Sequence, residues 1–275
     1  MTFDMNRAWE ESLRLLKANR ELVLVLAGLF IFLPAFALGV FKPETITGPE
    51  ITDTERMAEQ LNAYFAANGV WLVLLQLVQM VGILAILALF AKRRPTVGQA
   101  IGLGTRELFP LILGQLFLAA TLSVIGGLLF GVFAAFSQAL AIVFLIFWVA
   151  FVVYLLARLV AFVPILVFDR RLNPFTAMVD SWRLTKGKGG RIALFFFLLF
   201  LAIIVVSLLV GGVIALIAAL FGDGTVAVMV ASGLTTLWSA AYTVLLVAVI
   251  AAIFRQLVAT DAAGKAWTAT PGDKA

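Results

Sequence analysis

The chain of 275 residues contains neither cysteine nor histidine, and only 13% of its residues are charged. Without cysteine it has no disulfide, no thiolate nucleophile and no thiolate metal ligand. Without histidine it has no Ser-His-Asp triad, no histidine-ligated haem and none of the usual zinc ligand sets. We therefore expect no metal, no cofactor and no enzymatic activity.

Apolar residues dominate what is present. They make up 63% of the chain, whose mean hydropathy is +1.11, whereas soluble proteins are roughly 45–50% apolar. A membrane-spanning helix needs roughly 20 apolar residues, and five charge-free runs reach that length: 22–41, 70–91, 108–157, 192–222 and 224–254. The third run contains 50 residues, enough for two helices, with small and polar residues near 131–138. The sequence predicts an all-α, polytopic membrane protein with six transmembrane helices.

The segments between these runs are short. The longest, residues 42–69, has 28 residues, fewer than a soluble domain needs to fold alone. We therefore expect a single integral membrane domain over residues 1–275 that ends in a short polar tail, residues 259–275. No appended catalytic domain fits between the spans.

Lysine and arginine alternate in abundance from one connection to the next. Four precede the first span, four lie in the second connection, six in the fourth and three in the tail, whereas the first connection has two and the third and fifth have none. Basic connections stay in the cytoplasm, so we predict that both termini are cytoplasmic. The chain has a net charge of +5, and this excess faces anionic lipids. We expect a multi-pass membrane protein that binds no nucleic acid.

Two short polar segments share a pattern. Residues 8–17, AWEESLRLLK, and residues 177–186, AMVDSWRLTK, have Ala, Ser, Arg, Leu and Lys at the same offsets, and Glu11 pairs with Asp180. At 100° per residue both place apolar side chains on one arc and charged ones on the other. The pattern predicts two amphipathic helices on the cytoplasmic surface, with Trp9 and Trp182 suited to the membrane interface. The alternative is a chance resemblance between two short basic helices.

A fainter third copy precedes the third apolar run, where Ala100 and Arg106 have the spacing of Ala8 and Arg14. The third and the fourth run each contain a group of small residues, and both groups start at the sixteenth position of the run, at Ser123 and at Ser207. We therefore predict three repeats, each an interfacial helix followed by a transmembrane hairpin. The repeat units cover about residues 1–91, 92–168 and 169–258.

The C-terminal half contains a spaced set of aromatic, basic and small residues before a Phe/Leu-rich span: Tyr154-x-x-x-Arg158, then Pro164, then Ala177-x-x-x-Ser181-Trp182-x-Leu184-x-x-Gly187. This pattern resembles the membrane domain of bacterial glycerophosphoryl diester phosphodiesterases and of their stand-alone inner-membrane relatives. The resemblance implies a helical membrane fold and an inner-membrane location. In those phosphodiesterases a separate soluble barrel with histidine and carboxylates catalyses the reaction, so the resemblance implies no such activity for this chain.

Arg158 is the one charge inside a long apolar run, and such residues usually face a partner or water. It lies eleven residues before Asp169, and Pro164 is expected to bend the helix, so snorkelling to the headgroups is the alternative to burial. We predict that an anionic headgroup or carboxylate is contacted by a set of aromatic and basic residues at the inner leaflet: Tyr154, Arg158, Trp182, Arg183, Lys186 and Lys188.

Amides and hydroxyls inside the spans form a second candidate set. They would line a wet cavity, or else bond to backbone and neighbouring helices; they are Gln76, Gln79, Gln115, Thr235, Ser239 and Thr243. No acidic residue lies inside any predicted span, which argues against coupling to protons or sodium. A third set of small residues, at Ser123, Gly127, Gly131, Ser207 and Gly211, predicts close helix packing within the chain, with homodimerisation as the alternative.

These features favour a non-catalytic, lipid-associated scaffold, assembly factor or membrane-homeostasis factor. Its expected partners are membrane lipids, anionic ones above all, with a membrane-protein partner or a second copy as further possibilities. An uncoupled transporter or flippase-like carrier of a lipid or small amphiphile is the alternative. An intramembrane enzyme built on a polar cluster around Arg158 ranks third.

Overall fold

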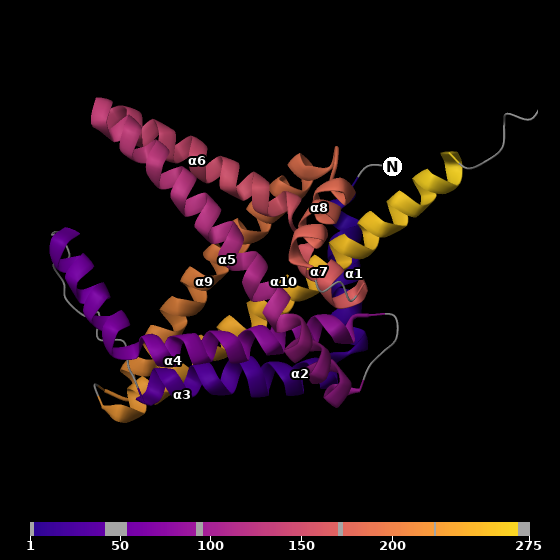
Figure 1. Cartoon of the computed structure of the whole chain (residues 1–275). Coiled ribbons are helices and arrows are strands. Elements are labelled where there is room, and N and C mark those ends of the chain that lie inside the picture. Colours follow the sequence, from indigo (N-terminus) through magenta and orange to yellow (C-terminus); the bar gives the residue numbers. More distant parts are fainter. Residues whose placement is uncertain (1–2, 42–53, 92–95, 170–172, 223, 269–275) are drawn as a thin grey trace, which may run out of the picture.

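The computed structural model describes residues 3–41, 54–91, 96–169, 173–222 and 224–268. This part of the chain is 92% helical and contains no strand. Six helical segments are long and apolar enough to cross a membrane (Figure 1). The all-α fold and the six candidate spans that the apolar runs predicted are confirmed.

The first hairpin follows a short separate helix. Helix α1 covers Met5–Ala18, and the first candidate span, Arg20–Phe41, combines α2 (Arg20–Ala27), the π-helical η1 (Gly28–Phe32) and α3 (Leu33–Phe41). Pro34 has no amide hydrogen and its ring crowds the carbonyl four residues earlier, which gives a reason for the wider turn just before it. Helix α4 (Thr54–Leu89) returns along this span.

The second hairpin consists of α5 (Val97–Phe136) and α6 (Gln138–Arg158). Thr96 and Gln99 form a capping box at the start of α5, which satisfies two amides of its first turn. Ser137 has an extended backbone that ends α5, and its hydroxyl accepts a hydrogen bond from Ala139 N at 3.2 Å to start α6. The break predicted within residues 131–138 is thus confirmed.

The chain then bends through a short connection at residues 159–161 into α7 (Phe162–Asp169). Pro164 lies in the first turn of α7, which agrees with the bend expected there. Helix α8 (Pro174–Leu184) starts at the N-cap Asn173, and α9 (Gly189–Ala219) and α10 (Thr225–Thr268) form the third hairpin.

The three hairpins meet at one end and separate toward the other. In Figure 1 the tip of the α5–α6 hairpin and the C-terminal ends of α3 and α9 lie toward the left, and α1, α7, α8 and the C-terminal part of α10 gather at the right. The pair α5–α6 points away from α3 and α4 (Figure 1). Only 6% of the most apolar 18-residue stretch is buried in α5 and in the α6–α7 span, against 50% in α10. Among the described residues, most of the tight packing therefore lies at the end where α1, α7 and α8 lie.

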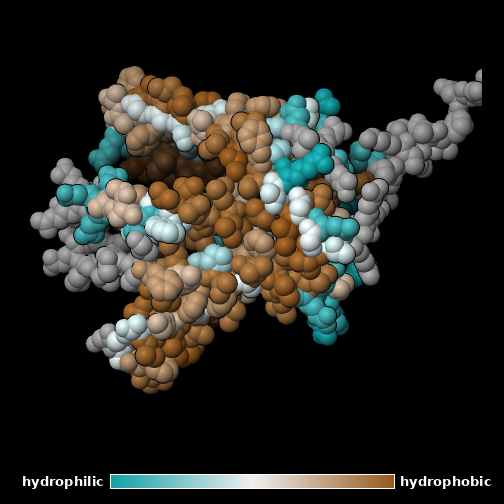
Figure 2. All heavy atoms as spheres, turned by 60° about the horizontal axis from the view of Figure 1, so that its bottom comes forward, coloured by the Kyte–Doolittle hydropathy of each residue, from teal (hydrophilic) through white to brown (hydrophobic). Residues whose placement is uncertain are grey.

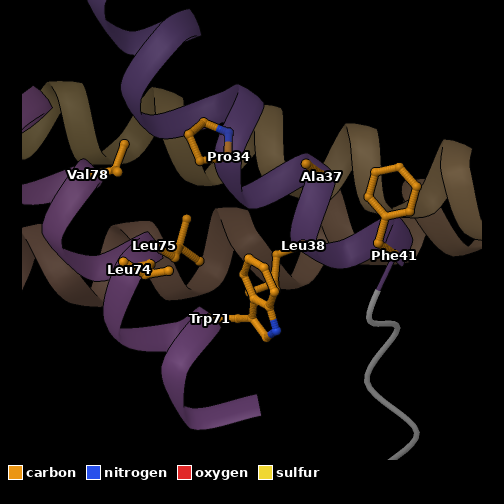
Figure 3. Close-up of a pocket in the computed structure, with 8 residues that line it drawn as sticks. All are labelled: Pro34, Ala37, Leu38, Phe41, Trp71, Leu74, Leu75 and Val78. Atoms are coloured by element: carbon orange, nitrogen blue, oxygen red, sulfur yellow. The ribbon is translucent and has the colours of Figure 1, made fainter.

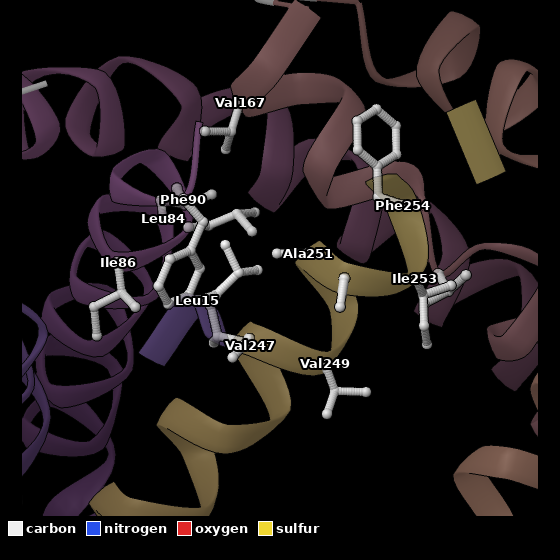
Figure 4. Close-up of a cluster of buried hydrophobic side chains, with 14 of the residues drawn as sticks. Leu15, Leu84, Ile86, Phe90, Val167, Val247, Val249, Ala251, Ile253 and Phe254 are labelled. Carbon is white, nitrogen blue, oxygen red and sulfur yellow. The ribbon is translucent and has the colours of Figure 1, made fainter. Parts of the chain in front are cut away.

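The packed core joins residues that are far apart in the sequence. Leu84–Phe90 of α4 and most of residues 247–257 of α10 are buried in one cluster with Val167 of α7 and Leu15 of α1 (Figure 4). Gly104 lets α5 approach this core, since a Cβ there would lie 2.8 Å from the carbonyl oxygen of Val81. Close van der Waals packing of this kind is the main attraction between helices in a bilayer.

The two short helices predicted at residues 8–17 and 177–186 exist and share a burial pattern, and their position at the membrane interface stays a prediction. Ala8 and Ser12 of α1, and the matching Ala177 and Ser181 of α8, are buried. Helix α1 packs on α10, and α8 packs on α7. The third copy differs from expectation, because residues 100–106 are the first part of the continuous helix α5. The threefold repeat and its unit boundaries stay a prediction.

The approach of α5 to α4 gives a test of the packing. Gly104→Ala should lower the stability of the purified protein, because overpacking a close helix contact typically costs about 1–3 kcal/mol. A Cβ at Gly102, two residues earlier on the same helix, would meet nothing within 4 Å. Gly102→Ala is the matched control and should keep or raise stability, since alanine favours helix by about 1 kcal/mol over glycine. Thermal unfolding in detergent measures both, and equal shifts would contradict the described packing.

Candidate functional site

Arg158, the last residue of α6, is buried with 5% of its surface exposed. Its Nη1 donates to the carbonyl of Thr185 and its Nη2 to the carbonyl of Trp182, each at 2.9 Å. Both carbonyls belong to the end of α8, where helix carbonyls have no partner within the helix and carry partial negative charge. The guanidinium therefore caps α8 and ties it to α6.

The contact between α6 and α8 is reciprocal. The carbonyl of Arg158 accepts hydrogen bonds from the hydroxyls of Ser181 at 3.0 Å and Thr185 at 2.9 Å. The guanidinium carbon also lies 4.1 Å from the centre of the Trp182 ring, a cation–π distance. Gly189 at the start of α9 completes the contact, because a Cβ there would lie 2.5 Å from Arg158 Cδ.

This geometry decides between the two positions considered for Arg158. The side chain is buried and bonded to backbone, and it does not snorkel. Trp182 is exposed over 43% of its surface and Tyr154 over 40%, so an apolar and aromatic rim surrounds the buried charge. Contact of Tyr154, Arg158 and Trp182 with a headgroup stays a proposal.

The other basic residues of the predicted set lie around the same helix ends. Arg183 is exposed and lies 3.9 Å from Asp180, one turn earlier on α8. Lys186 is exposed and Lys188, the N-cap of α9, is half-buried. Burial lowers the pKa of Lys188, and the charge of Asp261 acts in the opposite direction. The structure thus brings the six residues of this set together at the junction of α6, α8 and α9.

A second arginine holds α1 in a comparable way. Arg255 of α10 forms an ion pair with Glu11 of α1 at 2.9 Å and donates to the carbonyl of Phe90, next to the end of α4. Glu11 also pairs with Arg14 at 2.6 Å. Partial burial raises the pKa of Glu11, but hydrogen bonds and charges from Arg14 and Arg255 outweigh it and bring the pKa below its usual value. The sequence analysis missed Arg255 because it lies just after the last apolar run.

The amides and hydroxyls predicted to line a cavity are spread over several helices. Thr243 donates to the carbonyl of Ser239 at 2.8 Å, and Ser239 donates to the Tyr242 hydroxyl at 3.2 Å. Gln76 of α4, Gln115 of α5 and Thr235 of α10 are exposed, and Gln79 is half-buried. Their role in a wet cavity stays a prediction.

The predicted packing residues divide into two groups. Ser207 accepts a hydrogen bond from Trp238 Nε1 at 2.8 Å and so joins α9 to α10. A Cβ added at Gly127, Gly131 or Gly211 would meet nothing within 4 Å, and Ser123 is exposed. Gly126 packs α5 against α6, since a Cβ there would lie 2.6 Å from the Trp148 ring. Close packing within the chain thus involves the neighbour of the predicted Gly127.

A buried acidic residue was missed. Glu107 lies within α5, inside the candidate span Val97–Phe136, and is fully buried. The expectation that no span contains an acidic residue is therefore wrong. The apolar run begins one residue later, at 108, whereas the helix begins at Val97. Run length alone therefore placed Glu107 outside the span.

Two apolar grooves lie outside the packed core. One, of about 400 Å³, lies between α3 and α4 and is lined by residues such as Pro34, Leu38, Trp71 and Leu75 (Figure 3). The other, of about 420 Å³, lies between α9 and α10 beside Ile214 and Trp238. Hydrophobic residues cover most of the face in Figure 2, which also shows a hollow at its upper left.

Helical hairpins with apolar outer faces, joined at one end by the buried Arg158 and the half-buried Arg255, define a multi-pass integral membrane protein. More narrowly, the chain belongs to the family described as the membrane domain of glycerophosphoryl diester phosphodiesterase, whose model matches residues 130–268. The match covers the end of α5 and helices α6–α10, which include the Arg158 junction. This confirms the resemblance inferred from the sequence. No curated protein and no solved structure matches the chain.

The junction makes a prediction for stability. Arg158→Ala should lower the free energy of unfolding by about 3 kcal/mol, because hydrogen bonds to charged groups contribute about 1.5–3 kcal/mol each. Arg158→Lys keeps the charge but not the two-pronged donor geometry, and should fall between. The exposed Arg183→Ala is the control and should stay within about 0.5 kcal/mol of the wild type. Chemical or thermal unfolding in detergent gives the comparison, and equal losses for Arg158→Ala and Arg183→Ala would rule out the capping role.

Proposed function

We propose that this protein is a non-catalytic, lipid-associated factor of the bacterial inner membrane. It acts as a scaffold, assembly factor or membrane-homeostasis factor through the basic surface formed by α1 and α8. One observation carries the proposal: the short helix α8 exposes large apolar side chains and basic side chains together. Phe175, Val179 and Trp182 are exposed on α8, beside the exposed Arg183 and Lys186.

A surface of this composition suits the boundary between headgroups and acyl chains. Apolar and aromatic side chains enter the acyl region, while lysine and arginine stay with the anionic headgroups. Helix α1 has the same composition, with Trp9 and Leu13 exposed and the Arg14 side chain 74% exposed. Each basic residue near an anionic leaflet contributes about 1 kcal/mol. Two such helices at one end of the molecule favour anionic lipids as the main partners.

The hydroxyls of α10 support a non-catalytic role. Thr236 and Thr243 donate to carbonyls one turn earlier in the same helix, and Ser207 of α9 accepts from Trp238 of α10. These bonds satisfy polar groups that an apolar environment would otherwise penalise. A structural role explains them without a reaction.

The proposed orientation places both termini and α8 in the cytoplasm, because basic connections are retained there. The absence of cysteine allows a clean test. Ser137→Cys, between α5 and α6, should react with a membrane-impermeant maleimide in intact spheroplasts, whereas Lys186→Cys should react only after lysis. The reverse pattern would overturn the orientation.

The two apolar grooves favour a second candidate function, an uncoupled carrier of a lipid or small amphiphile. Grooves of about 400 and 420 Å³ fall in the range of small-molecule sites, about 300–1,000 Å³. Their linings are almost entirely apolar, which suits acyl chains better than polar solutes. A carrier would move labelled lipid between the leaflets of proteoliposomes, and a scaffold would not.

Lipid selectivity tests the leading proposal. In native mass spectrometry of the full chain, dioleoyl phosphatidylglycerol should be retained in preference to dioleoyl phosphatidylcholine. The double variant Arg183→Gln, Lys186→Gln should lose about tenfold or more of that preference, since two surface charges contribute about 2 kcal/mol.

The matched control is the double variant Arg183→Lys, Lys186→Arg, which keeps both charges and should keep the preference. A wild-type protein that binds the two lipids equally would refute the lipid-associated proposal. Lipid movement in proteoliposomes would favour the carrier instead.

A further inference from the structure

The connection between α8 and α9 has an unusual backbone. Gly187 has φ = +74°, a conformation that favours glycine because it has no Cβ. The chain then turns through Lys188 into Gly189, the first residue of α9. This turn directs the start of a helix of 31 residues toward the basic end of the molecule.

The first turn of α9 has amides that the helix does not use. The first helical bond at this end runs from Ile192 N to Lys188 O, at 3.1 Å, so the amides of Gly189, Gly190 and Arg191 precede it. The N-cap Lys188 provides no side-chain hydrogen bond to them. Free amides and the positive end of the helix dipole together form a place for an anion.

Positive side chains surround this turn. Lys186 and Arg191 are exposed on either side of it and Lys188 is half-buried within it. The pKa of Lys188 is lowered by burial, whereas Asp261 of α10 raises it. A bound anion at this position would favour the charged form of Lys188.

A second and independent observation concerns Arg158, which packs against the first residue of α9. Arg158 is 5% exposed, and its Nε is buried without a hydrogen-bond partner among the described residues. This nitrogen is bonded to the Cδ that packs against Gly189, where an added Cβ would lie 2.5 Å away. A buried donor without a partner is costly. The geometry leaves one donor of the guanidinium without a partner beside the first turn of α9, while both Nη atoms are bonded to the end of α8.

We propose that the first turn of α9 is a phosphate-binding site for an anionic phospholipid. The amides of Gly189, Gly190 and Arg191 hold the phosphate, and Lys186 and Lys188 neutralise it. The buried guanidinium of Arg158 supplies charge from behind. The inference deepens the proposed function and rests on its premise that this end of the protein lies at the headgroups.

Neighbouring apolar side chains favour a lipid over a free anion. Leu194 and Phe197 are exposed on the part of α9 that follows this turn. Tyr154 of α6 is also exposed, and its ring lies 3.3 Å from where a Cβ of Gly189 would be. They provide a surface for acyl chains just below the phosphate. A phosphate ester and free inorganic phosphate share the same chemistry at the amides, so the experiment must separate these sources.

Gly190 allows the amides to be tested without a change of charge. Gly190→Pro removes one amide hydrogen at a first-turn position where proline is tolerated. Gly190→Ala keeps that amide, and its Cβ would meet nothing within 4 Å. In titrations of the full chain in detergent, Gly190→Pro should bind dioleoyl phosphatidylglycerol about tenfold more weakly than the wild type, and Gly190→Ala should bind it equally.

A charge variant tests the same site independently, so that the test does not depend on folding of the proline variant. Lys188→Gln should also weaken phosphatidylglycerol binding severalfold, whereas Lys17→Gln on α1, which removes the same charge elsewhere, should have a smaller effect. Inorganic phosphate is added as a competitor in a separate arm. Displacement of the lipid by millimolar phosphate identifies free phosphate as a second ligand, and no displacement assigns the site to the lipid alone.

The outcomes separate this inference from the proposed function. If folded Gly190→Pro and Lys188→Gln both bind phosphatidylglycerol like the wild type, the α9 site is wrong even where Arg183→Gln, Lys186→Gln loses lipid selectivity. If Gly190→Ala weakens binding as much as Gly190→Pro, the amides are not the ligands. If the wild type itself shows no preference for phosphatidylglycerol, the proposed function fails.

Discussion

The structure depends on two arginines that complete the ends of neighbouring helices. A carbonyl at a helix end in an apolar environment needs a donor, because water is not there to supply one. Arg158 supplies two to the end of α8, and Arg255 supplies one next to the end of α4 while it pairs with Glu11 of α1. Arg158 ends the apolar helix α6, and Arg255 lies within α10 just after its apolar run, so each joins a candidate membrane span to a short helix, α8 or α1, at the same end of the molecule.

This constraint explains why packing is uneven. Around Arg255, residues of α4, α7, α10 and α1 form the buried core, whereas the far parts of α5 and α6 have little protein around them. In water, such exposed apolar helices would aggregate. In a bilayer the acyl chains cover them at no hydrophobic cost. The separated hairpins are thus a stable arrangement only within a membrane.

The same end carries the features on which the functional proposals rest. Helix α8 is held by buried polar contacts and helix α1 by half-buried ones, which leaves basic and aromatic side chains of both helices outside. Arg158 contributes both to stability and to the proposed lipid site, since it fixes α8 and lies against Gly189 at the start of α9. Stability and lipid contact are therefore coupled at this junction, and only variants such as Gly190→Pro, which leave Arg158 intact, can separate them.

The sequence by itself determined the membrane class, the six spans and the two short amphipathic helices, because each is a local property of composition and period. It also indicated the turn at 131–138 and the bend before Pro164. Only the tertiary structure decided that Arg158 is buried, that Arg255 pairs with Glu11 across 244 residues and that Gly126 rather than Gly127 packs. The burial of Glu107 belongs to the same group. These are properties of how distant helices meet, and one-dimensional periodicity does not contain the contacts that decide them.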